Sequence, residues 1–176
     1  MSTREALRVF QSRLADRLQQ ARVAGTAASW LAVEAGGLRL LFPLQHAGEI
    51  FPWQPLQRVP YTQPWFLGVA NLRGGLFGVA DIGAFVTGGD VPVRTEVAQL
   101  QCRLVALNPL LELNCALVVD RLLGLRNVDA FVASAEPPAG SPPYFGHTYT
   151  DAQGGTWQEL NLQTLSLQPQ FLGVSA

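Results

Sequence analysis

The sequence predicts an all-β fold preceded by one amphipathic helix. From residue 28 onward, short apolar runs alternate with turn residues at close spacing, which is typical of a β-barrel or β-sandwich. No long helical pattern recurs in that part. The 176 residues fit one domain, or one domain made of two small barrels, and can bury a substantial core.

The helix is predicted over residues 4–22. Apolar residues recur there at intervals of three and four, at Leu7, Phe10, Leu14, Leu18 and Ala21. Ser2 or Thr3 can cap its start. We therefore expect a helical extension over residues 1–26 and a β-domain over residues 27–176. The apolar face of this helix is expected to pack either against the β-domain that follows it or against a partner.

Four β-hairpins are predicted in order along the domain. Each is a pair of apolar runs around a turn: 29–34 with 38–44, 67–73 with 76–82, 102–107 with 113–119, and 145–149 with 156–162. Residues 87–96 read as a surface loop, and the proline-rich residues 137–143 read as a stiff connector.

The second hairpin carries a lone cation at its tip. Arg73 stands between two otherwise apolar arms, and Gly74-Gly75 can supply the positive φ angles of a tight turn. A guanidinium is rarely buried without a partner, so Arg73 is expected to face a cleft or another protein. The alternative is an ordinary solvated turn arginine.

Composition favours protein partners over nucleic acid or membrane. Hydrophobic residues make up 48% of the chain and charged residues only 14%, against the roughly 25% charged residues usual in soluble domains. All twelve basic residues are arginine and the net charge is −1, so no polybasic face for phosphates is expected. The longest apolar stretch, residues 104–119, is interrupted by polar residues, and no membrane insertion is expected.

No motif for catalysis, metal or cofactor is recognisable. Without lysine there is no phosphate-binding loop, and two histidines do not make a three-histidine metal site. Cys102 and Cys115 are interpreted as reduced core residues, and Asp81 and Asp120 as turn caps. The four tryptophans leave open a small barrel that binds an apolar ligand, and a cysteine-dependent enzyme is a further alternative.

Three segments, in order, resemble the CheW-like chemotaxis coupling proteins. The signature hairpin of that family resembles residues 69–74 together with 79–82. An upstream strand and its Glu-Ile pair resemble residues 41–44 and 48–50. A downstream hairpin resembles residues 103–107 together with 116–120. The similarity covers residues 28 to about 172. Gly78, Gly83 and Ala116 depart from the usual pattern.

A further match narrows the resemblance. One C-terminal pattern resembles the CheW-like proteins that serve twitching motility, the movement of cells by type IV pili. The pattern consists of residues 144–147 followed by Asp151, Gly154, Trp157, Glu159 and Leu160.

The resemblance implies a fold and a function. The fold would be two SH3-like five-stranded barrels packed together. The function would be non-catalytic coupling of a methyl-accepting chemoreceptor to a CheA-type histidine kinase in the cytoplasm, without cofactor or metal, and with contact to membrane receptor arrays only through partners. The receptor-binding residues would be Asn71, Leu72, Arg73 and Val119. The kinase-binding residues would be Glu49 and Ile50.

Overall fold

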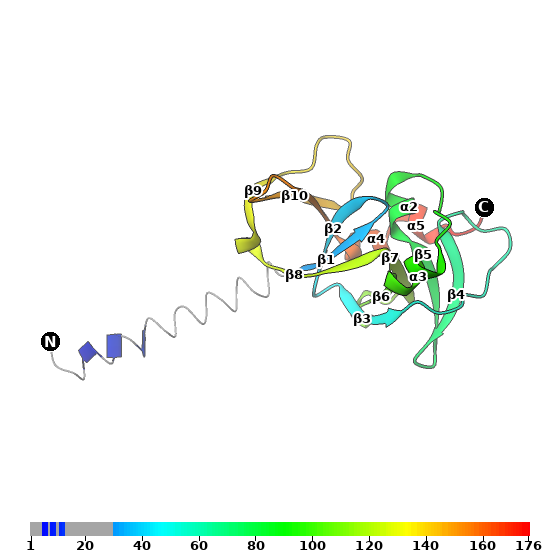
Figure 1. Cartoon of the computed structure of the whole chain (residues 1–176), viewed down its shortest axis with the longest axis horizontal. Coiled ribbons are helices and arrows are strands. Elements are labelled where there is room, and N and C mark those ends of the chain that lie inside the picture. The colour runs from blue at the N-terminus through cyan, green and yellow to red at the C-terminus, as the bar shows by residue number, and fades with distance from the viewer. Residues whose placement is uncertain (1–4, 7, 10, 13–29) are drawn as a thin grey trace.

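The computed structural model describes residues 5–6, 8–9, 11–12 and 30–176 (Figure 1). The few described residues before residue 30 are helical. The rest of the predicted helix over residues 4–22 lies outside the described residues, so the helical extension and the boundary at residues 26 and 27 stay predictions.

The described domain is mostly β-structure in two mixed sheets (Figure 1). One sheet has six strands in the order β8-β1-β2-β11-β10-β9, and the other has five in the order β3-β6-β7-β5-β4. Each holds one parallel pair, β2 with β11 and β5 with β7. The strands are β1 Trp30–Ala35, β2 Leu38–Pro43, β3 Ala47–Pro52, β4 Phe66–Leu72, β5 Gly75–Asp81, β6 Arg103–Leu107, β7 Cys115–Val119, β8 Arg121–Arg126, β9 Phe131–Ala135, β10 Phe145–Asp151 and β11 Thr156–Leu160.

The prediction of two five-stranded barrels needs correction. The first sheet has six strands, and no strand ladder joins the outer strands of either sheet among the residues from Trp30 to Ala176. In the five-stranded sheet a single bridge, Gln57 to Val69, links the chain after β3 to β4. Strand pairing therefore closes neither sheet into a complete ring, and the bridge shows that the five-stranded sheet curls toward closure.

All four predicted hairpins are present, as β1–β2, β4–β5, β6–β7 and β10–β11. Strands β3, β8 and β9 were not predicted. They lie at sheet edges and are largely exposed, so burial imposes no clear apolar pattern on them.

Short helices fill several connections. They are α2 Ile82–Thr87, α3 Glu96–Gln101, α4 Leu162–Ser166 and α5 Pro169–Leu172, with 3-10 turns at Pro109–Leu111 and Val128–Ala130. The predicted loop over residues 87–96 thus ends where α3 begins. Asp81 and Thr95 accept hydrogen bonds from Ala84 N and Ala98 N and so cap α2 and α3. Helices this short cannot display the repeat that identifies longer ones.

Strand alternation builds a core in three layers. In β6, Val105 and Leu107 point into a cluster between the two sheets, while Leu104 and Ala106 point into a second cluster inside the curled five-stranded sheet. A third cluster, around Trp30 and Trp157 and their neighbours, lies on the other face of the six-stranded sheet. The central strand β7 is buried along its whole length. Each sheet therefore packs on both faces, which fixes the strand register.

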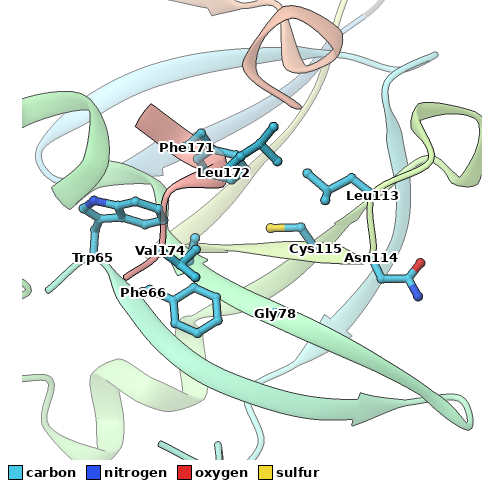
Figure 2. Close-up of a pocket in the computed structure, with 10 residues that line it drawn as sticks. Trp65, Phe66, Gly78, Leu113, Asn114, Cys115, Phe171, Leu172 and Val174 are labelled. Atoms are coloured by element: carbon cyan, nitrogen blue, oxygen red, sulfur yellow. The ribbon is translucent and has the colours of Figure 1, made fainter. Parts of the chain in front are cut away.

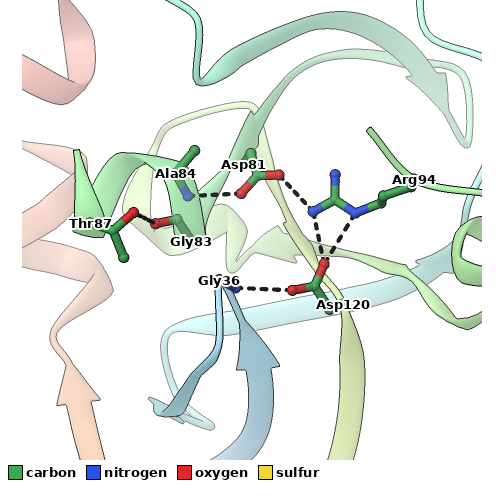
Figure 3. Close-up of polar contacts among 7 residues, drawn as sticks. All are labelled: Gly36, Asp81, Gly83, Ala84, Thr87, Arg94 and Asp120. Atoms are coloured by element: carbon green, nitrogen blue, oxygen red, sulfur yellow. Dashed lines mark hydrogen bonds and ion pairs between the residues drawn. The ribbon is translucent and has the colours of Figure 1, made fainter. Parts of the chain in front are cut away.

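A buried arginine ties the two sheets together (Figure 3). Arg94 donates to Asp81 at the end of β5 and to Asp120 after β7, at 2.7 and 2.8 Å, and its side chain is only 7% exposed. Asp120 also accepts from Gly36 N in the β1–β2 turn at 2.9 Å. Burial lowers the pKa of Arg94, but the hydrogen bonds and charges of the two carboxylates outweigh that effect and raise it above its usual value.

Two glycines allow the sheets to meet beside this network. A Cβ atom on Gly83 would lie 2.5 Å from Gly36 N, which is closer than a side chain tolerates. Gly83 is one of the positions where the sequence departs from the family pattern, and the close approach of the β1–β2 turn gives that departure a structural reason.

Candidate functional site

The candidate site is the tip of the β4–β5 hairpin. The last strand pair is Leu72 with Gly75, so the two turn residues are Arg73 and Gly74, with φ values of 49° and 78°. Two positive φ angles are what a two-residue type I′ turn requires. These angles were expected at Gly74-Gly75, and the register places them one residue earlier. Asn71 Oδ1 accepts from Gly74 N at 2.9 Å and holds the turn.

At this tip, Arg73 forms an ion pair with β3. Its Nη2 lies 2.6 Å from Glu49 Oε1, with side-chain exposures of 76% for Arg73 and 41% for Glu49. Glu49 lies in a β-bulge, because Gly48 and Glu49 together oppose one residue of β6 between the pairs Ala47–Leu107 and Ile50–Val105. The guanidinium is thus paired within the chain and still open to solvent.

The ion pair connects the two outer strands of the five-stranded sheet. β3 and the β4–β5 hairpin stand at opposite ends of the strand order. A direct contact between them requires the sheet to curl. The Gln57–Val69 bridge requires the same curvature. Residues assigned by resemblance to two partners, Arg73 and Glu49, therefore lie side by side on one surface.

The remaining predicted site residues divide by burial. Asn71 is exposed and Ile50 is 38% exposed, so both are accessible. Leu72 is 2% exposed and belongs to the inner cluster of the five-stranded sheet. Val119 is 0% exposed and lies between the sheets, so it does not line an accessible groove. Of these two residues, only Leu72 lies directly beneath the hairpin tip, because Val119 is at the other end of the β5–β7 pair.

One exposed residue beside the tip was missed. Leu76 pairs with Asn71 across the hairpin and is 65% exposed. It begins the apolar run of residues 76–82. The alternation of β5, read from the Leu72–Gly75 register, identifies it as outward-facing.

The described residues include no metal-binding cluster, and both cysteines lie in the core. No group of three or more His, Cys, Asp or Glu side chains suited to a metal occurs among them. Cys102 and Cys115 are free and buried. Burial raises the pKa of both thiols, that of Cys115 to about 12, which keeps them protonated and poorly nucleophilic at neutral pH. Their interpretation as core residues is confirmed by this burial.

A small apolar pocket lies at the base of the hairpin (Figure 2). It has a volume of about 110 Å³ between the hairpin and the C-terminal segment, with Trp65, Phe66, Cys115 and Phe171 among its walls. Sites for small molecules usually measure about 300–1,000 Å³. This pocket fits a single apolar side chain better than the ligand of the alternative hypothesis.

Comparison with known proteins assigns the family. Residues 29–168 match the sequence profile of the CheW-like domain. The chain belongs to the CheW-like domain family. This CheW-like chain is 26% identical to Protein PilI of Pseudomonas aeruginosa over 166 residues, which cover 93% of the chain and 89% of PilI. The match supports the narrower resemblance seen at residues 144–160.

The fold of the CheW-like chain is also found in a solved structure. The crystal structure of the scaffolding protein TtCheW from Thermoanaerobacter tengcongensis superimposes with a TM-score of 0.63. The two share 14% sequence identity, over 81% of this chain and 94% of TtCheW. In the part of the chain that the structure describes, no helix is long and apolar enough to cross a membrane.

Proposed function

We propose that this CheW-like protein is a non-catalytic adaptor that couples a methyl-accepting chemoreceptor to a CheA-type histidine kinase, in the control of twitching motility by type IV pili. The observation that carries the proposal is the hairpin tip, which presents an exposed guanidinium on a rigid turn in a domain of the CheW-like family.

The receptor contact is assigned to Arg73 and Asn71. The Arg73 side chain is 76% exposed and offers a planar donor fork to a carboxylate of the receptor. Its backbone is fixed by the two-residue turn and by the Asn71 hydrogen bond, so little backbone freedom is lost on binding. Leu76 adds apolar surface next to this cation.

The kinase contact is assigned to Glu49 and Ile50. The β3 edge presents a half-exposed carboxylate next to an apolar side chain, a combination that suits a partner strand edge or loop with a basic residue. The ion pair with Arg73 fixes the orientation of Glu49. The low content of charged residues, 14%, reduces the desolvation cost of such contacts.

Binding measurements with purified proteins test the proposal. We expect the full chain to bind the regulatory domain of the kinase and a receptor signalling fragment in isothermal titration calorimetry. Arg73→Glu should weaken receptor binding by about 1 to 3 kcal/mol, the size of an interface hot spot, with an almost unchanged melting temperature. Arg126→Glu serves as the control, because it makes the same change of charge at an arginine of the other sheet. Absence of binding to both partners would refute the adaptor function.

A further inference from the structure

A second surface lies at the other end of the five-stranded sheet. Two adjoining hollows of about 390 and 340 Å³ share Arg58 and Leu67 in their walls. The first follows the connector between β3 and β4, and the second continues toward Trp53 and Pro92. We call the two hollows together the Arg58 groove. Leu67 and the Arg73 tip are six residues apart along the hairpin, about 20 Å at the rise of a strand.

The Arg58 groove carries one uncompensated charge. Of its two charged residues, Arg94 is neutralised by Asp81 and Asp120. Arg58 is exposed and has no ion pair or side-chain hydrogen bond with any residue that the structure describes. An unpaired guanidinium between apolar walls is complementary to a carboxylate.

The side chain of one aromatic residue at the first hollow is exposed to solvent. Tyr61 is 90% exposed and has a φ of 57°, a conformation that is uncommon for a residue with a bulky side chain. The C-terminal segment fixes it there: Ala176 N donates to Tyr61 O at 2.9 Å, and Thr62 pairs with Ser175. In Figure 1 the connector between β3 and β4 accordingly lies at the same end of the molecule as the C-terminus.

Apolar side chains are also exposed on the segment that walls the second hollow. Val93, Val97 and Leu100 are 100%, 69% and 76% exposed, and α3 has no buried residue. Nothing within the described chain covers this face. A rim of tyrosine, arginine and aliphatic side chains has the composition of a protein interface.

We infer that the Arg58 groove is a docking surface for a peptide segment of a partner protein in which a carboxylate is flanked by apolar side chains. The carboxylate pairs with Arg58, the apolar side chains occupy the two hollows, and Tyr61 packs against the segment. This surface is separate from the residues assigned to the receptor and the kinase. A single cation does not suit nucleic acid, which requires several phosphate contacts.

A peptide selection tests the inference. The probe is a random library of 12-residue peptides displayed on phage and selected on the immobilised full chain, followed by fluorescence anisotropy with the enriched peptides. We expect enrichment of Asp or Glu between large apolar residues. Arg58→Glu should weaken binding about tenfold or more, and Tyr61→Asn, which tolerates the positive φ, should also weaken it. Arg121→Glu, an equal charge change at an exposed arginine of the six-stranded sheet, should leave the affinity within about twofold.

Three results would overturn the inference, once unchanged melting temperatures show that the variants are folded. One is undiminished binding of the selected peptides to Arg58→Glu. Another is enrichment without any preference for acidic residues. The third is concentration-dependent self-association of the purified chain that Arg58→Glu abolishes, because the occupant would then be a second copy of this chain.

Discussion

Arg94 Nη2 lies 2.7 Å from Asp81 Oδ2, and both side chains are almost completely buried, at 7% and 1% exposure. Asp120 completes the contact from the end of β7, at 2.8 Å. A buried ion pair compensates its own desolvation only while all its members are present. The network therefore makes the junction of the two sheets specific, and its removal should be costly.

We predict that Arg94→Met lowers the free energy of unfolding by about 3 to 5 kcal/mol, because it leaves the buried Asp81 carboxylate without its cation. Urea denaturation followed by tryptophan fluorescence measures the change. Arg121→Met, which breaks the exposed pair with Glu34, is the matched control and should cost less than about 1 kcal/mol. Similar losses in both variants would contradict the structural role of Arg94.

The charge swap Arg73→Glu with Glu49→Arg separates the two roles of the hairpin tip. The double variant can re-form an exposed ion pair, whose coupling energy in a double-mutant cycle should stay below about 1 kcal/mol. Receptor binding measured by calorimetry should remain impaired, because the cation has left the tip. Recovery of receptor affinity in the swapped protein would show that Arg73 acts only through Glu49.

Gly83→Ala should destabilise the protein by about 1 to 3 kcal/mol through steric overlap with the β1–β2 turn. The added Cβ would meet Gly36 N at 2.5 Å, and both segments are fixed by the sheets. Gly89→Ala is the control, since its nearest neighbour is the end of the Thr87 side chain at 3.2 Å. Thermal unfolding of the two variants measures the difference in stability. An unchanged melting temperature of the Gly83→Ala protein would argue against a close contact of the sheets.

Stability should decrease as the pH falls below about 6.5, the usual pKa of histidine, partly through His46. Burial lowers the pKa of His46, and its Nδ1 has no hydrogen-bond partner among the described residues. The unfolded chain then binds a proton at a higher pH than the folded chain does, so acid favours unfolding between the two pKa values. Melting temperatures at pH 7.5 and pH 5.5 should differ more for the native protein than for His46→Leu. Equal differences would show that His46 contributes nothing to the pH dependence.

Neither cysteine should react in the folded protein. Both thiols are buried with raised pKa values, so labelling with Ellman's reagent at pH 8 should be slow until denaturant is added. Rapid labelling of the native chain would reopen the alternative of a cysteine-dependent enzyme.

The hairpins could be predicted because their signals are local. Apolar runs such as residues 67–73 and 76–82 and the turn residues between them depend on neighbours in sequence. The position of Arg73 at a tip followed from that pattern alone. The exposed outer strands β3, β8 and β9 were not predicted, because few of their side chains are buried and their sequences therefore show no clear alternation of apolar and polar residues.

The site itself was predicted only in part. The resemblance named Arg73 and Glu49 as separate candidates and did not predict that they pair, because their strands stand at opposite ends of the strand order and meet only when the sheet curls. Val119 was expected in a groove and lies in the core, since β7 is covered on both faces. Arg94 was assigned to a loop and gave no local sign of its buried partners.

The β-class, the four hairpins, the cation at the second hairpin tip and the CheW-like family could be predicted from the residues in order, because periodicity, turn chemistry and motif order are properties of short segments. The folded molecule was needed to show which charges meet, which apolar residues remain at the surface and how the two sheets join. Those outcomes depend on contacts between residues tens of positions apart, such as Gly36 with Asp120, and the packing of one sheet against the other brings these two residues together.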